Sequence, residues 1–220
     1  MPRTVIATGG ARSRRGTAEG RPRSVAAFAN RFGPMPRGTY LHESDVEERF
    51  SCAPDGGGWR YNAERSDGGT VELVADGRWR PARLQVTAGE HVLRGGAAGP
   101  ELLWVTGGRE NSARAAGFLG ESPGLLVAVA RSLGLAEREQ ADVRVLVLTE
   151  PALAVRTVPQ RWRLTEIAWH DADEGRLPVE RYEVTDLETG EVAESYLAGD
   201  VVLAAPGIEL ADLEDPPNFP

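Results

Sequence analysis

The chain has 220 residues, which is enough for one substantial hydrophobic core. Hydrophobic residues make up 41% of it and five are tryptophan, a composition typical of folded globular proteins and not of disordered ones. No apolar run approaches the roughly 20 residues of a membrane-spanning helix, so we expect no integral membrane segment. All 25 basic residues are arginine, and the abundance of Ala, Gly, Arg and Pro indicates a GC-rich bacterial genome.

The charge is unevenly distributed along the chain. Residues 1–38 carry eight arginines and one acid, whereas the remainder carries 17 arginines and 32 acids. An acidic body argues against nucleic acid as a partner, because phosphate binding depends on cationic surface. We predict a disordered, Arg-rich arm at 1–38, a single β-barrel-like domain at 39–210, and an acidic, Pro-rich tail at 211–220. The arm is either a solvated tail or a contact for an anionic surface.

Targeting and redox signals are sparse. Arg14 and Arg15 resemble the start of a twin-arginine export signal, but the apolar stretch at 25–29 is shorter than the ~7–15 residues such a signal needs. We therefore expect a cytoplasmic protein. The single cysteine, Cys52, excludes an intramolecular disulfide and is expected to be a small core residue.

One helix is clearly predicted, over residues 122–135. Ser122 is a suitable N-cap, Pro123 suits the first helical position, and Gly134 suits the left-handed position after the end. Between these ends Arg131 is the only charged residue, so the helix is apolar nearly all round and should be buried. Its residues Leu125, Leu126, Val129 and Leu133 are expected either to fill the interior of a sheet or to form one wall of a cavity.

Short strands flank this helix on both sides. Gly-, Pro- and Asp-rich turns separate them, and the segment 170–176 is expected to be an acidic turn. The predicted strands are 47–52, 59–65, 70–75, 79–87, 91–94, 101–105, 142–149, 155–169, 179–186, 192–197 and 201–205. We predict a mainly β fold: an antiparallel, curved or incompletely closed barrel of about ten strands, with the two meanders as halves of one sheet around the helix.

The sequence contains no strong catalytic, metal or cofactor motif. Its three histidines, His42, His91 and His170, are not at metal-ligand spacing from one another, and neither a GxGxxG nor a Walker-type loop is present. The segment 42–45 contains a histidine, a serine and two acids, but catalytic triads are assembled across a fold and not from neighbours. We predict no catalytic residues, no metal and no cofactor.

Aromatic residues in the predicted strands are the best candidates for a ligand site. Trp and Tyr suit a ligand with both apolar and polar parts, although they also fill β cores. Arg161 lies beside Trp162 on the opposite face of its strand, where it either meets an anionic head group or pairs with an acid on the next strand. The predicted ligand-binding residues are Trp59, Trp104, Leu126, Val129, Arg161, Trp162, Trp169, Tyr182 and Tyr196.

The second half of the chain contains two short motifs, Pro-Ala-Leu-Ala-Val at 151–155 with Gln-Arg-Trp at 160–162, and Ala-Pro-Gly-Ile at 205–208. Both resemble motifs of the bacterial glycolipid-binding family. Residues 151–155, Pro-Ala-Leu-Ala-Val, followed by Gln-Arg-Trp at 160–162, are similar to its Pro-x-Leu-x-Val strand and Gln-Arg-aromatic pattern. Ala-Pro-Gly-Ile at 205–208 is similar to its Tyr-Pro-Gly-Leu signature, with Ala205 in place of the aromatic residue. The family's Asn-Thr-Leu-Pro-Ile-Arg segment is absent at 125–131. The resemblance implies a curved barrel, like that of bacterial lipoprotein carriers, around a hydrophobic cavity.

Three functions are compatible with these observations. The first is non-catalytic binding of an amphipathic, lipid-like small molecule, possibly a glycolipid, in an apolar cavity. The second is a β-barrel enzyme of bacterial small-molecule or natural-product metabolism, which would need an acid and a base converging on a pocket. The third is an interaction module. The first is favoured by the strand aromatics and the buried helix.

Overall fold

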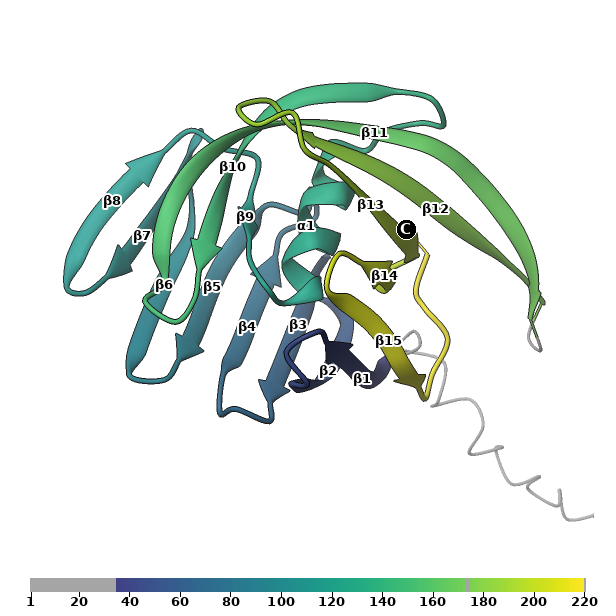
Figure 1. The fold of residues 1–220 in the computed structure, drawn as a ribbon, viewed down its shortest axis with the longest axis horizontal. Coiled ribbons are helices and arrows are strands. Elements are labelled where there is room, and N and C mark those ends of the chain that lie inside the picture. Colours follow the sequence, from purple (N-terminus) through teal and green to yellow (C-terminus); the bar gives the residue numbers. More distant parts are fainter. Residues whose placement is uncertain (1–34, 173–174, 220) are drawn as a thin grey trace, which may run out of the picture. The chain divides into compact units, whose positions relative to one another are not determined.

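In the computed structural model, residues 35–172 and 175–219 are described and form one sheet of fifteen strands with one α-helix (Figure 1). The elements are β1 (Arg37–His42), β2 (Glu47–Asp55), β3 (Gly58–Arg65), β4 (Thr70–Ala75), β5 (Pro81–Ala88), β6 (His91–Ala98), β7 (Glu101–Thr106), β8 (Arg109–Ala113), β9 (Phe118–Leu119), α1 (Pro123–Leu133), β10 (Gln140–Thr149), β11 (Ala154–Ala172), β12 (Gly175–Asp186), β13 (Val192–Ala198), β14 (Val201–Ala205) and β15 (Ile208–Leu213).

The strand order confirms that the two meanders are halves of one curved sheet. From one edge to the other it runs β8 to β1 in descending order and then β15 to β9, again descending. The two halves meet where β1 pairs with β15, and all neighbours are antiparallel except β9 and β10. Because the edge strands β8 and β9 do not pair with each other, the sheet is open, as the expected incompletely closed barrel would be.

The expected number of strands, about ten, was wrong, because four strands were not predicted: β1, β8, β9 and β15. β8 has the sequence Arg-Glu-Asn-Ser-Ala and is largely exposed at the sheet edge, while β9 is only two residues long. β1 begins at Arg37, in the segment assigned to the basic arm; the rest of that arm up to residue 34 lies outside the described residues. β15 ends at Leu213 and so includes the start of the segment expected to be a loose tail.

The predicted helix is confirmed. Pro123 occupies its first turn, and Gly134 ends it with a φ of 56° in the left-handed region. Ser122 stands at the N-cap but makes no capping hydrogen bond. Arg131 is 8% exposed in its side chain, donates to the carbonyl of Gly199 and pairs with Glu180 at 2.7 Å, which ties the helix to the second half of the sheet.

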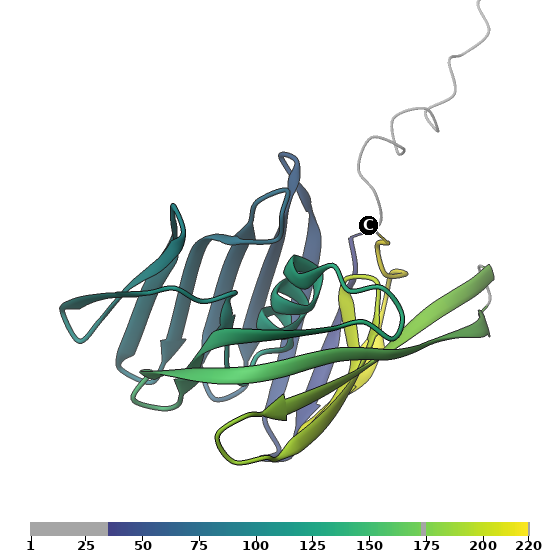
Figure 2. The same ribbon diagram turned by 90° about the horizontal axis from the view of Figure 1, so that it is seen from above.

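The residues of α1 pack against the concave side of the sheet (Figure 2). Leu125 and Val129 are buried in one continuous hydrophobic cluster, and the half-buried Leu126 and Leu133 pack against it. The backbone of Gly124 lies so close to the ring of Tyr61 that an added Cβ would collide with it. Of the two expected positions for this helix, core or cavity wall, the structure favours core.

The acidic turn expected at 170–176 was wrong, since strands β11 and β12 pair through most of it. His170 lies opposite Leu177 and Asp171 opposite Arg176, so the hairpin extends beyond the rest of the sheet (Figure 2). The opposite charges of Asp171 and Arg176 favour this pairing. The one helix of the described residues, α1, has 11 residues and is too short to span a bilayer.

Candidate functional site

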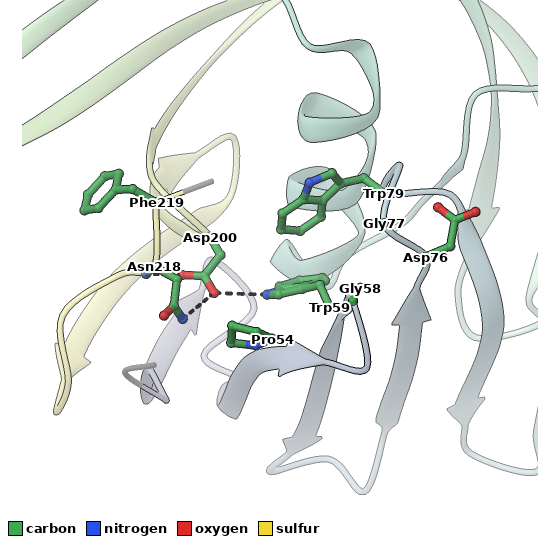
Figure 3. Close-up of a pocket in the computed structure, with 10 residues that line it drawn as sticks. Pro54, Gly58, Trp59, Asp76, Gly77, Trp79, Asp200, Asn218 and Phe219 are labelled. Carbon is green, nitrogen blue, oxygen red and sulfur yellow. Dashed lines mark hydrogen bonds between the residues drawn. The ribbon is translucent and has the colours of Figure 1, made fainter. Parts of the chain in front are cut away.

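A pocket of about 210 Å³ opens where the turns of the first half-sheet meet the C-terminal segment (Figure 3). Trp59 and Trp79 form its aromatic part, and Asp200 and Asn218 form its polar part. Phe219, which is 48% exposed, lies on the side of Asn218 away from the two tryptophans (Figure 3). The pocket therefore presents flat apolar surfaces beside hydrogen-bonding groups, the combination typical of small-molecule sites.

Trp79 is held in an unusual backbone conformation by the turn between β4 and β5. Asp76 organises this turn: its Oδ1 accepts hydrogen bonds from the backbone N–H of Arg78 at 2.9 Å and of Arg80 at 3.0 Å. The backbone N–H of Trp79 donates to the carbonyl of Asp76 at 2.9 Å. Trp79 has a φ of 61°, in the left-handed region that favours glycine over a bulky side chain. Its ring lies 5.1 Å from that of Trp59, at an interplanar angle of 45°.

Asp200 is the buried anchor of the polar side. It lies in the turn between β13 and β14 and is only 3% exposed. Its Oδ2 accepts from Trp59 Nε1 at 3.0 Å and from Asn218 Nδ2 at 2.9 Å, and its Oδ1 accepts from the backbone N–H of Asn218 at 2.7 Å. Four donors in all surround this carboxylate, because the Cys52 thiol also donates to Oδ2 at 3.5 Å.

The C-terminal segment is fixed across this turn. Besides the two hydrogen bonds from Asn218 to Asp200, Pro217 is buried, and a side chain at Gly199 would collide with the carbonyl oxygen of Asn218. Gly199 has a φ of 52°, so both its conformation and its close approach need glycine. Asn218 and Phe219, in the segment expected to be loose, therefore line the pocket.

Cys52 is confirmed as a core residue in β2, 2% exposed. Burial, reinforced by the adjacent charge of Asp200, raises the pKa of its thiol far above the usual range. The cysteine is thus a neutral hydrogen-bond donor and lacks the thiolate that a nucleophile needs.

A second polar group is buried between the sheet and the start of α1. Glu48, which is fully buried, accepts hydrogen bonds from Tyr61 Oη at 2.7 Å and Ser122 Oγ at 2.6 Å, and its Oε2 lies 3.1 Å from His42 Nε2. Burial raises the pKa of Tyr61, and the charge of Glu48 adds to this. Ser122 is 2% exposed, so its hydroxyl is not available to a substrate. We interpret this group as the anchor of the helix.

The nine predicted ligand-binding residues are not brought together. Trp59 is the one that lines the pocket beside Asp200. Core positions are occupied by Trp104, Val129, Trp162 and Tyr182, with Leu126 packed against the core. The others lie on the outer surface or near it: Trp169 is 55% exposed with Arg176 5.5 Å over its ring, Tyr196 donates to Glu194 at 3.1 Å, and Arg161 pairs with Asp142 at 2.7 Å.

The other residues of the pocket were harder to recognise from the sequence. Trp79 was one of the aromatic residues of the predicted strands, but the structure places it in the turn before β5. Asp200 belonged to a predicted turn and Asn218 to the expected tail, so nothing in the local pattern joined them to Trp59. Among the described residues no cluster of three or more metal-ligating side chains is found.

Comparisons with known proteins bear on the fold alone. No family model matches the chain, and no curated protein matches it. Among solved structures, it is similar to a DUF1089 family protein from Pseudomonas aeruginosa, with a TM-score of 0.50 and 22% identity over 89% of this chain and 97% of that one. At this identity the likeness supports the mainly β, open-sheet architecture.

Proposed function

We propose that the protein is a non-catalytic binding protein for a small amphipathic molecule, and that the pocket beside Trp59 and Trp79 receives part of that molecule. The observation that carries this proposal is the conformation of Trp79. A bulky residue in the left-handed region costs on the order of 1–3 kcal/mol, and such strain is concentrated at ligand sites. Glycine at this position would relieve the strain. The presence of tryptophan instead therefore points to a role for its indole ring.

The chemistry of the pocket suits a ring with apolar faces and a polar edge. The indoles of Trp59 and Trp79 offer flat apolar surface, while the side-chain amide of Asn218, oriented by its hydrogen bond to Asp200, offers a polar group within the same pocket. A sugar ring has this character, which agrees with the resemblance of the second half of the chain to glycolipid-binding proteins. The volume of about 210 Å³ lies below the ~300–1,000 Å³ of drug-sized sites, so the pocket suits one ring, with an attached chain lying outside it.

The enzyme alternative has less support. His91 and His170 are both exposed, and the Cys52 thiol beside the pocket has a raised pKa and is already a donor to Asp200. Asp200 has four donors around it. We therefore do not assign a general acid or base to the pocket.

The proposal is tested by titrating octyl glucoside, below its critical micelle concentration, into the purified protein and measuring heat of binding. Trp79→Ala should weaken binding at least about tenfold, because it removes one aromatic wall. Trp169→Ala is the matched control: it removes an exposed tryptophan on the β11–β12 hairpin and should leave the affinity unchanged. Equal affinity of the wild type and Trp79→Ala, or the absence of binding to the wild type, would overturn the proposal.

A further inference from the structure

A larger groove, of about 530 Å³, lies beside β10, next to the β9 edge of the sheet. It exists because β10 is ten residues long, whereas its outer neighbour β9 pairs with it only at Leu146 and Val147. The backbone N–H of Ala116 donates to the carbonyl of Arg144 at 2.8 Å. N-terminal to that contact, β10 has no strand on its outer side among the described residues, and the groove occupies this place.

The groove combines an apolar floor with positive charge. Val143, Pro159 and Leu187 contribute apolar surface, and Arg114 and Arg144 are exposed on its lining. Within the described part of the chain, neither arginine forms an ion pair.

The one acid on the lining does not cancel this charge. Asp142 is held by Arg161 through two hydrogen bonds of 2.7 and 2.8 Å, and this pairing lowers the pKa of the Asp142 carboxyl. The groove therefore keeps an excess of two positive charges in a chain whose residues 39–220 carry 32 acids and 17 arginines. The net acidic charge of the chain repels anions, whereas the two arginines, unpaired among the described residues, attract an anion to this groove.

We propose that this groove is a second binding site, separate from the tryptophan pocket, for a small amphiphile with a single anionic head group such as a carboxylate. Arg114 and Arg144 would bind the head group, since guanidinium groups pair well with carboxylates. The apolar chain would cover Val143, Pro159 and Leu187. The volume of about 530 Å³ lies within the ~300–1,000 Å³ range of small-molecule sites.

The site is tested with decanoate below its critical micelle concentration, followed through the backbone amide resonances of Ala116 and Val143 and by the dissociation constant. The double variant Arg114→Gln, Arg144→Gln should bind decanoate at least about fivefold more weakly. Arg83→Gln, an exposed arginine on β5, is the matched control and should leave the affinity unchanged. Decanol, which has the chain without the charge, should bind the wild type and the double variant equally.

Three outcomes would overturn this site. One is equal decanoate affinity of the wild type and the double variant, and another is a response to acetate as strong as that to decanoate, which would leave no role for the apolar floor. The third is loss of decanoate binding in Trp79→Ala, since the two sites are separate. The tryptophan pocket is tested by the loss of octyl glucoside affinity in Trp79→Ala, and the groove by the loss of decanoate affinity in the Arg114→Gln, Arg144→Gln variant. Because each test depends on a different variant, the two proposals can fail independently.

Discussion

Trp59 Nε1 donates a hydrogen bond of 3.0 Å to Oδ2 of Asp200, a carboxylate 141 residues later in the chain that is almost fully buried. This contact joins the first half of the sheet to the second at the wall of the pocket. Asp200→Ala leaves the Trp59 indole, the Asn218 amides and the Cys52 thiol without their acceptor. We expect a loss of about 3 kcal/mol or more in the free energy of unfolding, measured by urea denaturation. Asp142→Ala, which removes an exposed carboxylate, is the control and should have little effect.

The Trp79 side chain should favour ligand binding, whereas its strained backbone conformation should lower the stability of the protein. Trp79→Gly removes both the ring and the left-handed strain, whereas Trp79→Ala removes the ring and keeps the strain. We therefore expect the free energy of unfolding of the Gly variant to exceed that of the Ala variant by about 1 kcal/mol, the usual preference for glycine at positive φ. Both variants should lose the octyl glucoside affinity. A less stable Gly variant would show that Trp79 is not strained.

The sign of the stability change in Gly124→Ala tests the close packing of α1 against Tyr61. In most helices, replacing an interior glycine by alanine stabilises the helix by roughly 1 kcal/mol. Here the added Cβ would meet the buried ring of Tyr61, whose hydroxyl is held by Glu48. We expect Gly124→Ala to destabilise the protein by about 1–3 kcal/mol, as overpacking does. A rise in thermal midpoint would show that the helix can move away from β3.

Substitution of the buried Glu48 should lower the stability of the protein strongly, because its carboxylate anchors the start of α1. Ser122→Ala removes one of its donors and should cost about 1 kcal/mol. Glu48→Ala leaves the Tyr61, Ser122 and His42 side chains without an acceptor and should cost about 3–5 kcal/mol. Ser112→Ala, at an exposed position of β8, serves as the control. Equal unfolding midpoints for Ser122→Ala and Ser112→Ala would contradict the anchoring role.

Stability should fall in alkaline solution. Burial is the main cause that raises the pKa of Tyr40, Tyr61, Tyr182 and Cys52 above their ordinary values. The folded state therefore keeps protons that the unfolded state loses, so stability present at neutral pH declines as pH rises through about 9 to 10. Urea midpoints measured across this range should decrease, and tyrosinate absorption of these residues should appear only as the protein unfolds. Tyr182→Phe should make the decline less steep. A midpoint independent of pH would contradict the burial of these hydroxyl groups.

The sequence predicted the features that depend on local patterns. The helix was recognisable from Pro123 and Gly134, which act within one turn of its ends, and the alternation at Leu84 and Val86 predicted β5. Strand β8 was missed because an exposed edge strand needs no apolar face, and β15 because its partner, β1, is far away in the chain. The pocket, too, depends on contacts between residues that are far apart in the chain. Trp59 was found as a strand tryptophan, but Asp200 and Asn218 acquire their roles only from contacts across the two halves of the sheet.

The pairing of β1 with β15 places the first and last strands of the described chain at the centre of the sheet. During synthesis, β1 to β8 can form a complete meander from neighbouring segments, but the outer edge of β1 stays without a partner until Ile208–Leu213 has been made. An unpaired edge is a template for strands of other chains. The nascent chain is therefore open to self-association through β1 until β15 has been made. A truncation before Ile208 would leave this edge of β1 permanently unpaired.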